Sequence, residues 1–323
     1  MGTVLEVRDL VTRFHTSQGV VHAVNGISYS LDSGESLAIV GESGSGKTVA
    51  ALSLMGLVPP PGRVESGEVI LGGREILGLS GKEWRNVRGS EISMVFQDPM
   101  TSLNPVLTVG YQLTEGLRRH MGLSRSEART EAVRLVDLVG IPNGVQRLAS
   151  YPHEFSGGQR QRVMIAMALA CKPAVLIADE PTTALDVTIQ DQIVRLMKEL
   201  QAELGMGIVW ITHDLALVAG LADRVAVMYA GSIVEEATVA DLYRRARHPY
   251  TLGLLNSLPD GDHAVSSRLE AIEGRPPDLR ERFARCPFVD RCSHAIERCS
   301  TEKPVLESVG EKHTSACWRR EDL

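Results

Sequence analysis

Short apolar runs and amphipathic segments alternate along most of the chain. The runs of strand length are residues 4–7, 20–31, 36–40, 67–71, 92–96, 175–178, 207–212 and 224–229. After Thr188, apolar residues recur every three or four positions through Leu200, which predicts a helix with one buried face. Because strands and helices alternate, we expect an α/β fold whose parallel sheet is covered on both faces.

Two stretches depart from this alternation. At about residues 100–158, Leu, Arg and Glu recur at helical spacing without a strand pattern, which predicts an inserted helical subdomain. From about residue 246 the pattern gives way to Pro, Arg and Cys. We therefore expect a main domain at residues 1–245 and a C-terminal extension at residues 246–323.

Composition and charge narrow the class of protein. The chain has 323 residues, of which 43% are hydrophobic and 23% charged, as in soluble globular proteins. Its net charge of −6 gives no general basic surface for nucleic acid, which disfavours that partner without excluding it. No run approaches the roughly 18 apolar residues of a membrane helix, and the first residues lack a signal-peptide pattern. We expect a cytoplasmic protein that reaches a membrane only through a partner.

One loop matches a phosphate-binding motif. The motif G-x-x-x-x-G-K-[ST] is matched by Gly41-Glu42-Ser43-Gly44-Ser45-Gly46-Lys47-Thr48. Its glycines let backbone N–H groups turn toward phosphates, and the following helix adds its positive N-terminal end. Lys47 would reach the β- and γ-phosphates, and the Thr48 hydroxyl would ligate Mg²⁺. A chance glycine turn is the alternative, but the apolar strand before it and the helical pattern after it favour a nucleotide site.

Two adjacent carboxylates follow a buried strand. The apolar run at residues 175–178 ends at Asp179 and Glu180. Ligands of open α/β sheets bind at this edge, so Asp179 would hold the magnesium shell. Glu180, one residue further and pointing differently, would act as general base toward the attacking water. Such a pair is weak evidence alone, and gains weight beside the phosphate-binding loop.

A further motif connects these elements to a family. The segment Phe155-Ser156-Gly157-Gly158-Gln159 resembles the Leu-Ser-Gly-Gly-Gln signature of ABC ATPases, with Phe in place of Leu. The resemblance implies a P-loop, RecA-like ABC ATPase core with antiparallel β and helical subdomains. It also implies that Ser156, Gly158 and Gln159 face the γ-phosphate held by a second subunit. The segment can equally be an N-cap, with Ser156 capping a helix that starts near Gln159, and both interpretations can hold together.

The resemblance assigns roles to four more residues. Gln97 would link Mg²⁺ and the attacking water to the helical subdomain, and Asp186, in Ala184-Leu185-Asp186, would contact the other subunit. His213 would reach the γ-phosphate, and Phe14 is the candidate for stacking on adenine. The implied protein is an ATPase that uses ATP and Mg²⁺ and pairs with a second, related ATPase subunit.

The C-terminal part points to one branch of the family. The segment from His248 to Pro259, followed by Gly274-Arg275-Pro276-Pro277, resembles the tail of dipeptide and oligopeptide importer ATPases, a branch that includes nickel importers. This implies two membrane permease subunits, an extracytoplasmic substrate-binding protein and a place on the cytoplasmic face of the cell membrane. The alternatives are a soluble ABC ATPase acting on nucleic acid or ribosomes, and a regulatory nucleotide binder without hydrolysis.

Four cysteines cluster in the extension. They are spaced Cys286-x5-Cys292-x6-Cys299-x17-Cys317. In a reducing compartment such a cluster is more often a metal site than a set of disulfides. An iron–sulfur cluster, zinc and free thiols all remain open, and the wide spacing favours the first. The resemblance adds that some peptide-importer ATPases carry a [4Fe–4S] centre at similar cysteines.

Overall fold

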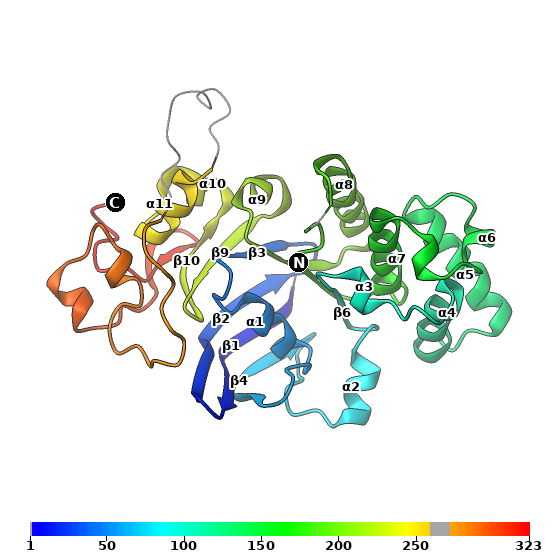
Figure 1. Ribbon diagram of the computed structural model, residues 1–323, viewed down its shortest axis with the longest axis horizontal. Coiled ribbons are helices and arrows are strands. Elements are labelled where there is room, and N and C mark those ends of the chain that lie inside the picture. The colour runs from blue at the N-terminus through cyan, green and yellow to red at the C-terminus, as the bar shows by residue number, and fades with distance from the viewer. Residues whose placement is uncertain (1, 184, 259–271) are drawn as a thin grey trace. The chain divides into compact units, whose positions relative to one another are not determined.

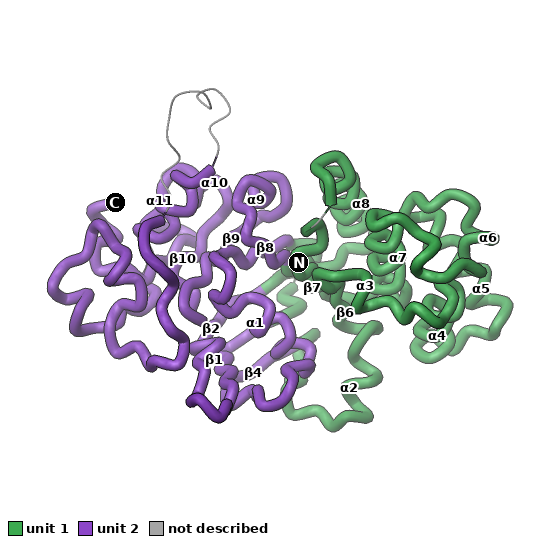
Figure 2. The backbone as a smooth tube through the Cα atoms, viewed as in Figure 1, with its two compact units in different colours: residues 1–5, 31–35, 71–209 green, residues 6–30, 36–70, 210–323 purple. Residues whose placement is uncertain are grey.

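The computed structural model describes residues 2–183, 185–258 and 272–323, so Ala184 and Pro259 of the motifs above lie outside it. The chain divides into two compact units, coloured separately in Figure 2. Unit 1 comprises residues 1–5, 31–35 and 71–209, and unit 2 comprises residues 6–30, 36–70 and 210–323. Each unit is assembled from several separate stretches of sequence.

Unit 2 contains two sheets. The first has the strand order β2-β1-β4, formed by Gly19–Asp32, Thr3–Thr16 and Gly62–Leu71. In the second, β3 (Ser36–Val40) pairs in parallel with β9 (Arg224–Tyr229). Every residue of β3 is buried, as expected for a parallel strand covered on both faces.

The second sheet of unit 2 continues with antiparallel strands that the sequence pattern did not predict. Strand β10 (Ser232–Thr238) pairs with β9, β12 (His313–Ser315) pairs with β10, and β11 (Glu307–Gly310) pairs with β12. The C-terminal residues therefore join the sheet that also holds β3. These strands are short or carry polar residues, so they lack the apolar runs that predicted the others.

The helices of unit 2 are mostly short. They are α1 (Lys47–Leu54), α9 (Leu215–Leu221), α10 (Val239–Arg245), α11 (Pro249–Asn256) and the 3₁₀ turns η2 (Val289–Arg291) and η3 (Glu297–Ser300). Three rings pack together between β9, α11 and the residues before η2. The centroid of Tyr229 lies 4.5 Å from that of Tyr250 and 5.2 Å from that of Phe288. This aromatic cluster fixes the C-terminal part of the chain to the end of β9.

Unit 1 contains a parallel pair of strands and most of the longer helices. Strand β6 (Ile92–Val95) lies beside β7 (Val175–Asp179), and both are buried along their length. Strand β8 (Gly207–Thr212) crosses from unit 1 into unit 2. The remaining elements are β5 (Arg74–Glu75), α2 (Gly81–Val87), α3 (Pro99–Ser102), α4 (Val109–His120), α5 (Arg125–Leu138), α6 (Gly144–Arg147), η1 (Pro152–Glu154), α7 (Gly157–Leu169) and α8 (Val187–Leu204).

The helical stretch predicted at residues 100–158 is observed as helices without a strand. Helices α4, α5 and α7 pack against one another (Figure 1). Capping residues mark where they begin: Ser124 and Glu127 form a capping box at α5, and Thr108 accepts from the Tyr111 amide at α4. The predicted helix after Thr188 is α8, with Ile193, Leu196, Met197 and Leu200 buried.

Each predicted strand coincides with or overlaps an observed one, and β1 continues to Thr16, well beyond the predicted residue 7. The domain boundary at residue 245 remains a prediction. Among the described residues, none of the helices combines the length and the apolar character that crossing a bilayer requires.

A buried carboxylate joins β10 to the C-terminal strand. The side chain of Glu235 is 0% exposed, and its Oε1 lies 2.8 Å from Nε2 of His313 in β12. The same oxygen accepts from the Arg247 amide at 2.5 Å. A buried carboxylate is costly unless it is hydrogen-bonded, so these donors are what allow Glu235 to lie in the sheet.

Among the described residues, His313→Ala leaves the Arg247 amide as the donor to this carboxylate. We expect the free energy of unfolding to fall by about 2 kcal/mol, because a buried acceptor that loses a hydrogen-bond donor costs roughly 1–3 kcal/mol. Urea denaturation of the full chain measures it. Asp322→Ala is the matched control, because its pair with Arg319 is exposed and is worth less than about 1 kcal/mol. Equal losses in the two variants would contradict a stabilising role for the buried pair.

Candidate functional site

The phosphate-binding loop of unit 2 is so tightly packed that two of its positions have no room for a side chain. Gly41 follows β3 with φ 153°, and a Cβ there would lie 2.2 Å from the carbonyl oxygen of Met228. Gly46 precedes α1 with φ 102°, and a Cβ there would lie 2.2 Å from the carbonyl oxygen of Ala23. Glycine is required at both ends of the loop, which supports the interpretation as a phosphate cradle over a chance turn.

The ammonium group of Lys47 and the hydroxyl group of Thr48 belong to the first two residues of α1. Nζ of Lys47 donates to the carbonyl oxygens of Gly41 at 2.7 Å and Glu42 at 3.0 Å. The ammonium group thus lies over the loop, where a bound phosphate would offer it stronger, charged acceptors. Ser43, Gly44 and Thr48 are exposed, and Ser45 is buried. The loop therefore fits the triphosphate of a nucleotide through its shape, its cation and the helix N-terminus that follows it.

In unit 1, two adjacent carboxylates lie where β7 ends. Asp179 is the last residue of the strand and only 2% exposed. Glu180 adopts φ 44°, a left-handed conformation that is uncommon for a residue with a Cβ. Strained backbone of this kind is concentrated at functional sites.

The structure brings Gln97 and Glu180 together. Nε2 of Gln97 donates to Oε2 of Glu180 at 2.9 Å, and Oγ1 of Thr183 donates to the same oxygen at 2.9 Å. Gln97 follows β6 and Glu180 follows β7, the parallel neighbour of β6. The end of each strand thus supplies one member of the pair. Thr183 was not singled out from the sequence, although its position three residues after Glu180 in a tight turn is a local signal.

The signature segment caps a helix in unit 1. Ser156 is the N-cap of α7: its Oγ accepts from the Gln159 amide at 3.3 Å, and the Gln159 side chain accepts from the Ser156 amide at 3.1 Å. The N-cap interpretation predicted this cap, and the helix begins at Gly157, two residues before the expected start. Ser156 is exposed while the preceding Phe155 is buried, so the helix N-terminus opens toward solvent. Because the Ser156 hydroxyl is the acceptor in this cap, its own hydrogen can be donated to another group.

Asp186 occupies the equivalent position on the next helix of unit 1. It is the exposed N-cap of α8, and its Oδ1 accepts from the Ile189 amide at 2.9 Å. Gly158 in the first turn of α7 lies against Ile189, because a Cβ on the glycine would lie 2.8 Å from Ile189 Cγ2. The starts of α7 and α8 are therefore in contact. This explains why position 158 needs a glycine.

Two predicted residues of unit 2 are placed without a resolved role. His213 follows β8 directly and is exposed. Phe14 is half-buried in β1, with its ring against the backbone of Gly62, where a Cβ would lie 2.5 Å from Phe14 Cε1. The contacts of His213 with a γ-phosphate and of Phe14 with adenine remain predictions.

The four cysteines of the extension lie in one region of unit 2. Cys286, Cys299 and Cys317 are buried and Cys292 is half-buried. Burial, with a smaller contribution from the neighbouring cysteines, raises the pKa of the Cys286 and Cys317 thiols to about 11. In the part of the chain that the structure describes, no three His, Cys, Asp or Glu side chains are grouped so that they could hold a metal ion. The thiols as placed do not fit an iron–sulfur cluster or zinc, and that prediction has no structural support.

Two protein families match the chain. Residues 24–183 match the family described as ABC transporter. Residues 234–299 match the family described as oligopeptide/dipeptide transporter, C-terminal region. The first match includes the phosphate-binding loop, Gln97, the Ser156 segment and both carboxylates. The second begins in β10 and ends at Cys299.

Curated relatives align with nearly the whole chain. The probable peptide ABC transporter ATP-binding protein y4tR of Sinorhizobium fredii is 51% identical over 320 residues, covering 99% of this chain and 96% of the relative. The oligopeptide transport ATP-binding protein OppD of Bacillus subtilis is 52% identical over 315 residues, covering 97% of this chain and 88% of the relative.

A solved structure matches the ATPase part. The dimeric post-hydrolysis state of the ATP-binding cassette MJ0796, bound to ADP and Pi, superposes with a TM-score of 0.65 at 27% identity. The match covers 73% of this chain and 98% of that one. The sequence similarity and the fold agree: the chain belongs to the ABC transporter family, as one of the ATP-binding subunits that carry the oligopeptide/dipeptide transporter C-terminal region.

Proposed function

We propose that this chain hydrolyses Mg²⁺-bound ATP as one half of a pair of ATPase subunits, and that the pair powers the import of peptides through a membrane permease. The observation that carries the proposal is the position of Glu180. Its carboxylate follows the buried Asp179 directly, and Gln97 and Thr183 both donate to it. A carboxylate held in place at the end of a parallel strand suits proton abstraction from a water molecule.

The residues of one chain divide the chemistry between them. In unit 2, the loop amides and Lys47 would bind the phosphates and the Thr48 hydroxyl would ligate Mg²⁺. In unit 1, Gln97 and Asp179 would ligate Mg²⁺. Glu180 accepts the proton of the attacking water, which Gln97 orients. Mg²⁺, when bound, would supply positive charge against the charge that develops on the transferred phosphoryl group. Phosphoryl transfer depends mainly on positioning and charge, so each group acts by being fixed in place before the reaction.

The second half of each site comes from another subunit. The exposed start of α7 presents Ser156, Gly158 and Gln159, and a helix N-terminus favours a phosphate. The Asp186 cap of α8 lies beside it and would meet the second subunit. The cassette MJ0796 is a dimer in the structure that contains ADP and Pi, which supports the same arrangement here. We propose a related but different ATPase subunit as the partner.

The substrate follows from the relatives. The relatives reported above are named for peptide and oligopeptide transport, which supports peptides over nickel as the cargo. Two permease subunits and an extracytoplasmic binding protein would select the peptide, while this chain supplies the energy. It would therefore lie on the cytoplasmic face of the cell membrane, bound through the permease.

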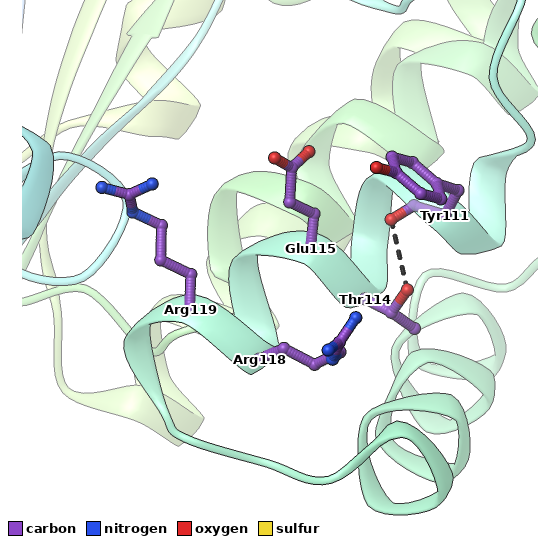
Figure 3. Close-up of a pocket in the computed structure, with 5 residues that line it drawn as sticks. All are labelled: Tyr111, Thr114, Glu115, Arg118 and Arg119. Carbon is purple, nitrogen blue, oxygen red and sulfur yellow. Dashed lines mark hydrogen bonds between the residues drawn. The ribbon is translucent and has the colours of Figure 1, made fainter.

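Helix α4 offers a surface for the permease. A pocket on this helix has a volume of about 280 Å³. It is lined by Tyr111, Thr114, Glu115, Arg118 and Arg119, which Figure 3 draws as sticks. Tyr111 is 56% exposed, although its ring is large and aromatic. An exposed tyrosine beside arginines is typical of protein interfaces. We propose that a permease segment binds in this pocket.

The pocket is connected to the catalytic glutamine along the chain. Asp98, which follows Gln97, caps α3, and Asn104 after α3 is tied to α4 through Gln112. The Asn104 amide donates to Gln112 Oε1 at 2.9 Å, and Gln112 Nε2 donates to the Asn104 carbonyl at 3.1 Å. A shift of Gln97 during hydrolysis would therefore reach α4 through a hydrogen-bonded segment.

Glu180→Gln keeps the size of the side chain and removes the proton acceptor. We expect ATP to bind normally, turnover to fall at least about 100-fold, and an ATP-bound pair to persist in size-exclusion chromatography. Glu199→Gln, an exposed substitution on α8, is the control and keeps normal turnover. Near-normal hydrolysis by the Glu180 variant would remove this residue from the role of general base.

Tyr111→Ala removes the ring from the pocket on α4. We expect binding to the membrane subunits to weaken about tenfold, measured by co-purification from membranes at graded subunit concentrations. Tyr151→Ala is the matched control, since Tyr151 is 41% exposed and lies outside the pocket. If both variants co-purify like the parent chain, the permease does not bind in this pocket.

A further inference from the structure

The second residue of the phosphate-binding loop forms an ion pair with the C-terminal extension. Glu42 Oε2 accepts from Nη1 of Arg291 at 2.6 Å, and Oε1 accepts from Nη2 at 2.9 Å. The Arg291 side chain is 5% exposed and that of Glu42 is 28% exposed. Two parallel hydrogen bonds from a planar guanidinium fix the carboxylate in both position and orientation.

Ring contacts and a hydrogen bond to a backbone carbonyl restrict the Arg291 side chain. Its guanidinium lies over the rings of Tyr229 and Phe288, at 5.9 and 5.8 Å from their centroids. Its Nε donates to the carbonyl oxygen of Glu273 at 3.0 Å. These contacts leave the arginine little freedom, so its charge stays beside the loop. An exposed surface pair would lack this rigidity.

A second contact from the same part of the chain reaches the backbone of the loop. The hydroxyl oxygen of Tyr250, in α11, accepts from the Glu42 amide at 2.8 Å. Burial raises the pKa of this phenol, so it stays neutral and its oxygen acts as a simple acceptor. Glu42 is therefore held by its side chain and by its backbone at once. The carbonyl oxygen of Glu42 accepts from Nζ of Lys47 at 3.0 Å. Fixing Glu42 therefore also fixes an acceptor for the Lys47 ammonium group.

Arg291 neutralises the negative charge of Glu42, which would otherwise repel the phosphates of ATP. A carboxylate in a loop that binds a triphosphate repels the ligand unless a cation neutralises it. In unit 2, the buried Arg291 supplies that charge in a bidentate pair. Lys47 alone would otherwise have to offset both Glu42 and the phosphates.

We propose that Arg291 is a positioning residue of the ATP site, which neutralises and orients Glu42 so that the phosphate-binding loop can accept ATP. The C-terminal extension is then part of the nucleotide site. This inference rests on the proposed binding of ATP by the loop. It assigns to the extension a role in nucleotide affinity that is separate from any role in substrate choice.

The test compares the ATP affinity of a variant that lacks the Arg291 charge with that of a variant that lacks the charges of both Arg291 and Glu42. Arg291→Met leaves Glu42 uncompensated, and we expect the Kd for ATP, measured by titration of the full chain without Mg²⁺, to rise about tenfold. In the double variant Arg291→Met, Glu42→Gln the repulsion is absent, and the Kd should return to within about threefold of the parent value. Arg285→Met is the matched control, because its pair with Asp290 in the same extension is exposed, and its Kd should not change.

A purely structural role of Arg291 predicts a different result. In that case the double variant would bind ATP as poorly as Arg291→Met, or worse, since both hydrogen-bonding partners are gone. Salt screens the repulsion between Glu42 and the phosphates. The ratio of variant to parent Kd should therefore decrease as the salt concentration is raised from 50 to 500 mM. A ratio that does not depend on salt, or a double variant without rescue, overturns the proposal.

Two outcomes separate this inference from the proposed function. If the parent chain binds no ATP, the proposed function fails, whereas equal ATP binding by the parent and Arg291→Met defeats only the inference. If Arg291→Met does not fold, Glu42→Gln decides. That variant keeps Arg291 and loses the negative charge, so it should bind ATP at least as tightly as the parent, and weaker binding overturns the proposal.

Discussion

The close approach of backbone to backbone around the phosphate-binding loop is the constraint on which the site in unit 2 depends. At Gly41 the loop touches the Met228 carbonyl of β9, and at Gly46 it touches the Ala23 carbonyl of β2. These strands belong to different sheets of the unit. The loop is thereby fixed at both ends before any ligand arrives, so that its amides need little reorganisation to bind an anion.

Unit 1 uses a related solution with different chemistry. The backbone reverses direction after the buried Asp179, and the positive φ of Glu180 turns its carboxylate toward Gln97. In both units a buried parallel strand ends abruptly, and the functional groups lie in the first residues beyond it. Rigid strands supply the position, while strained or glycine-containing turns supply the direction of the side chains.

Local features of the site could be predicted from the sequence, and long-range pairs could not. The cap formed by Ser156 and Gln159 and the tight loop at Gly41 to Lys47 depend on residues that are neighbours in sequence. The pair of Glu42 and Arg291 joins residues 249 positions apart, and that of Glu235 and His313 joins residues 78 positions apart. The cysteine spacing predicted a metal site, but the geometry of four thiols depends on tertiary packing that spacing does not determine. Strand β10 was missed because its glutamates obscure the apolar pattern.

The contact between Gly158 and Ile189 has a consequence for how two subunits meet. Because Gly158 has no side chain, the first turn of α7 packs directly against the Ile189 side chain of α8, and a shift of one helix start pushes on the other. In the proposed pair, the hydroxyl of Ser156 and the carboxylate of Asp186 would thus arrive at the neighbouring chain in one concerted approach. An interface that engaged only Ser156 or only Asp186 would require α7 and α8 to separate. Docking of the second subunit would therefore be all-or-none.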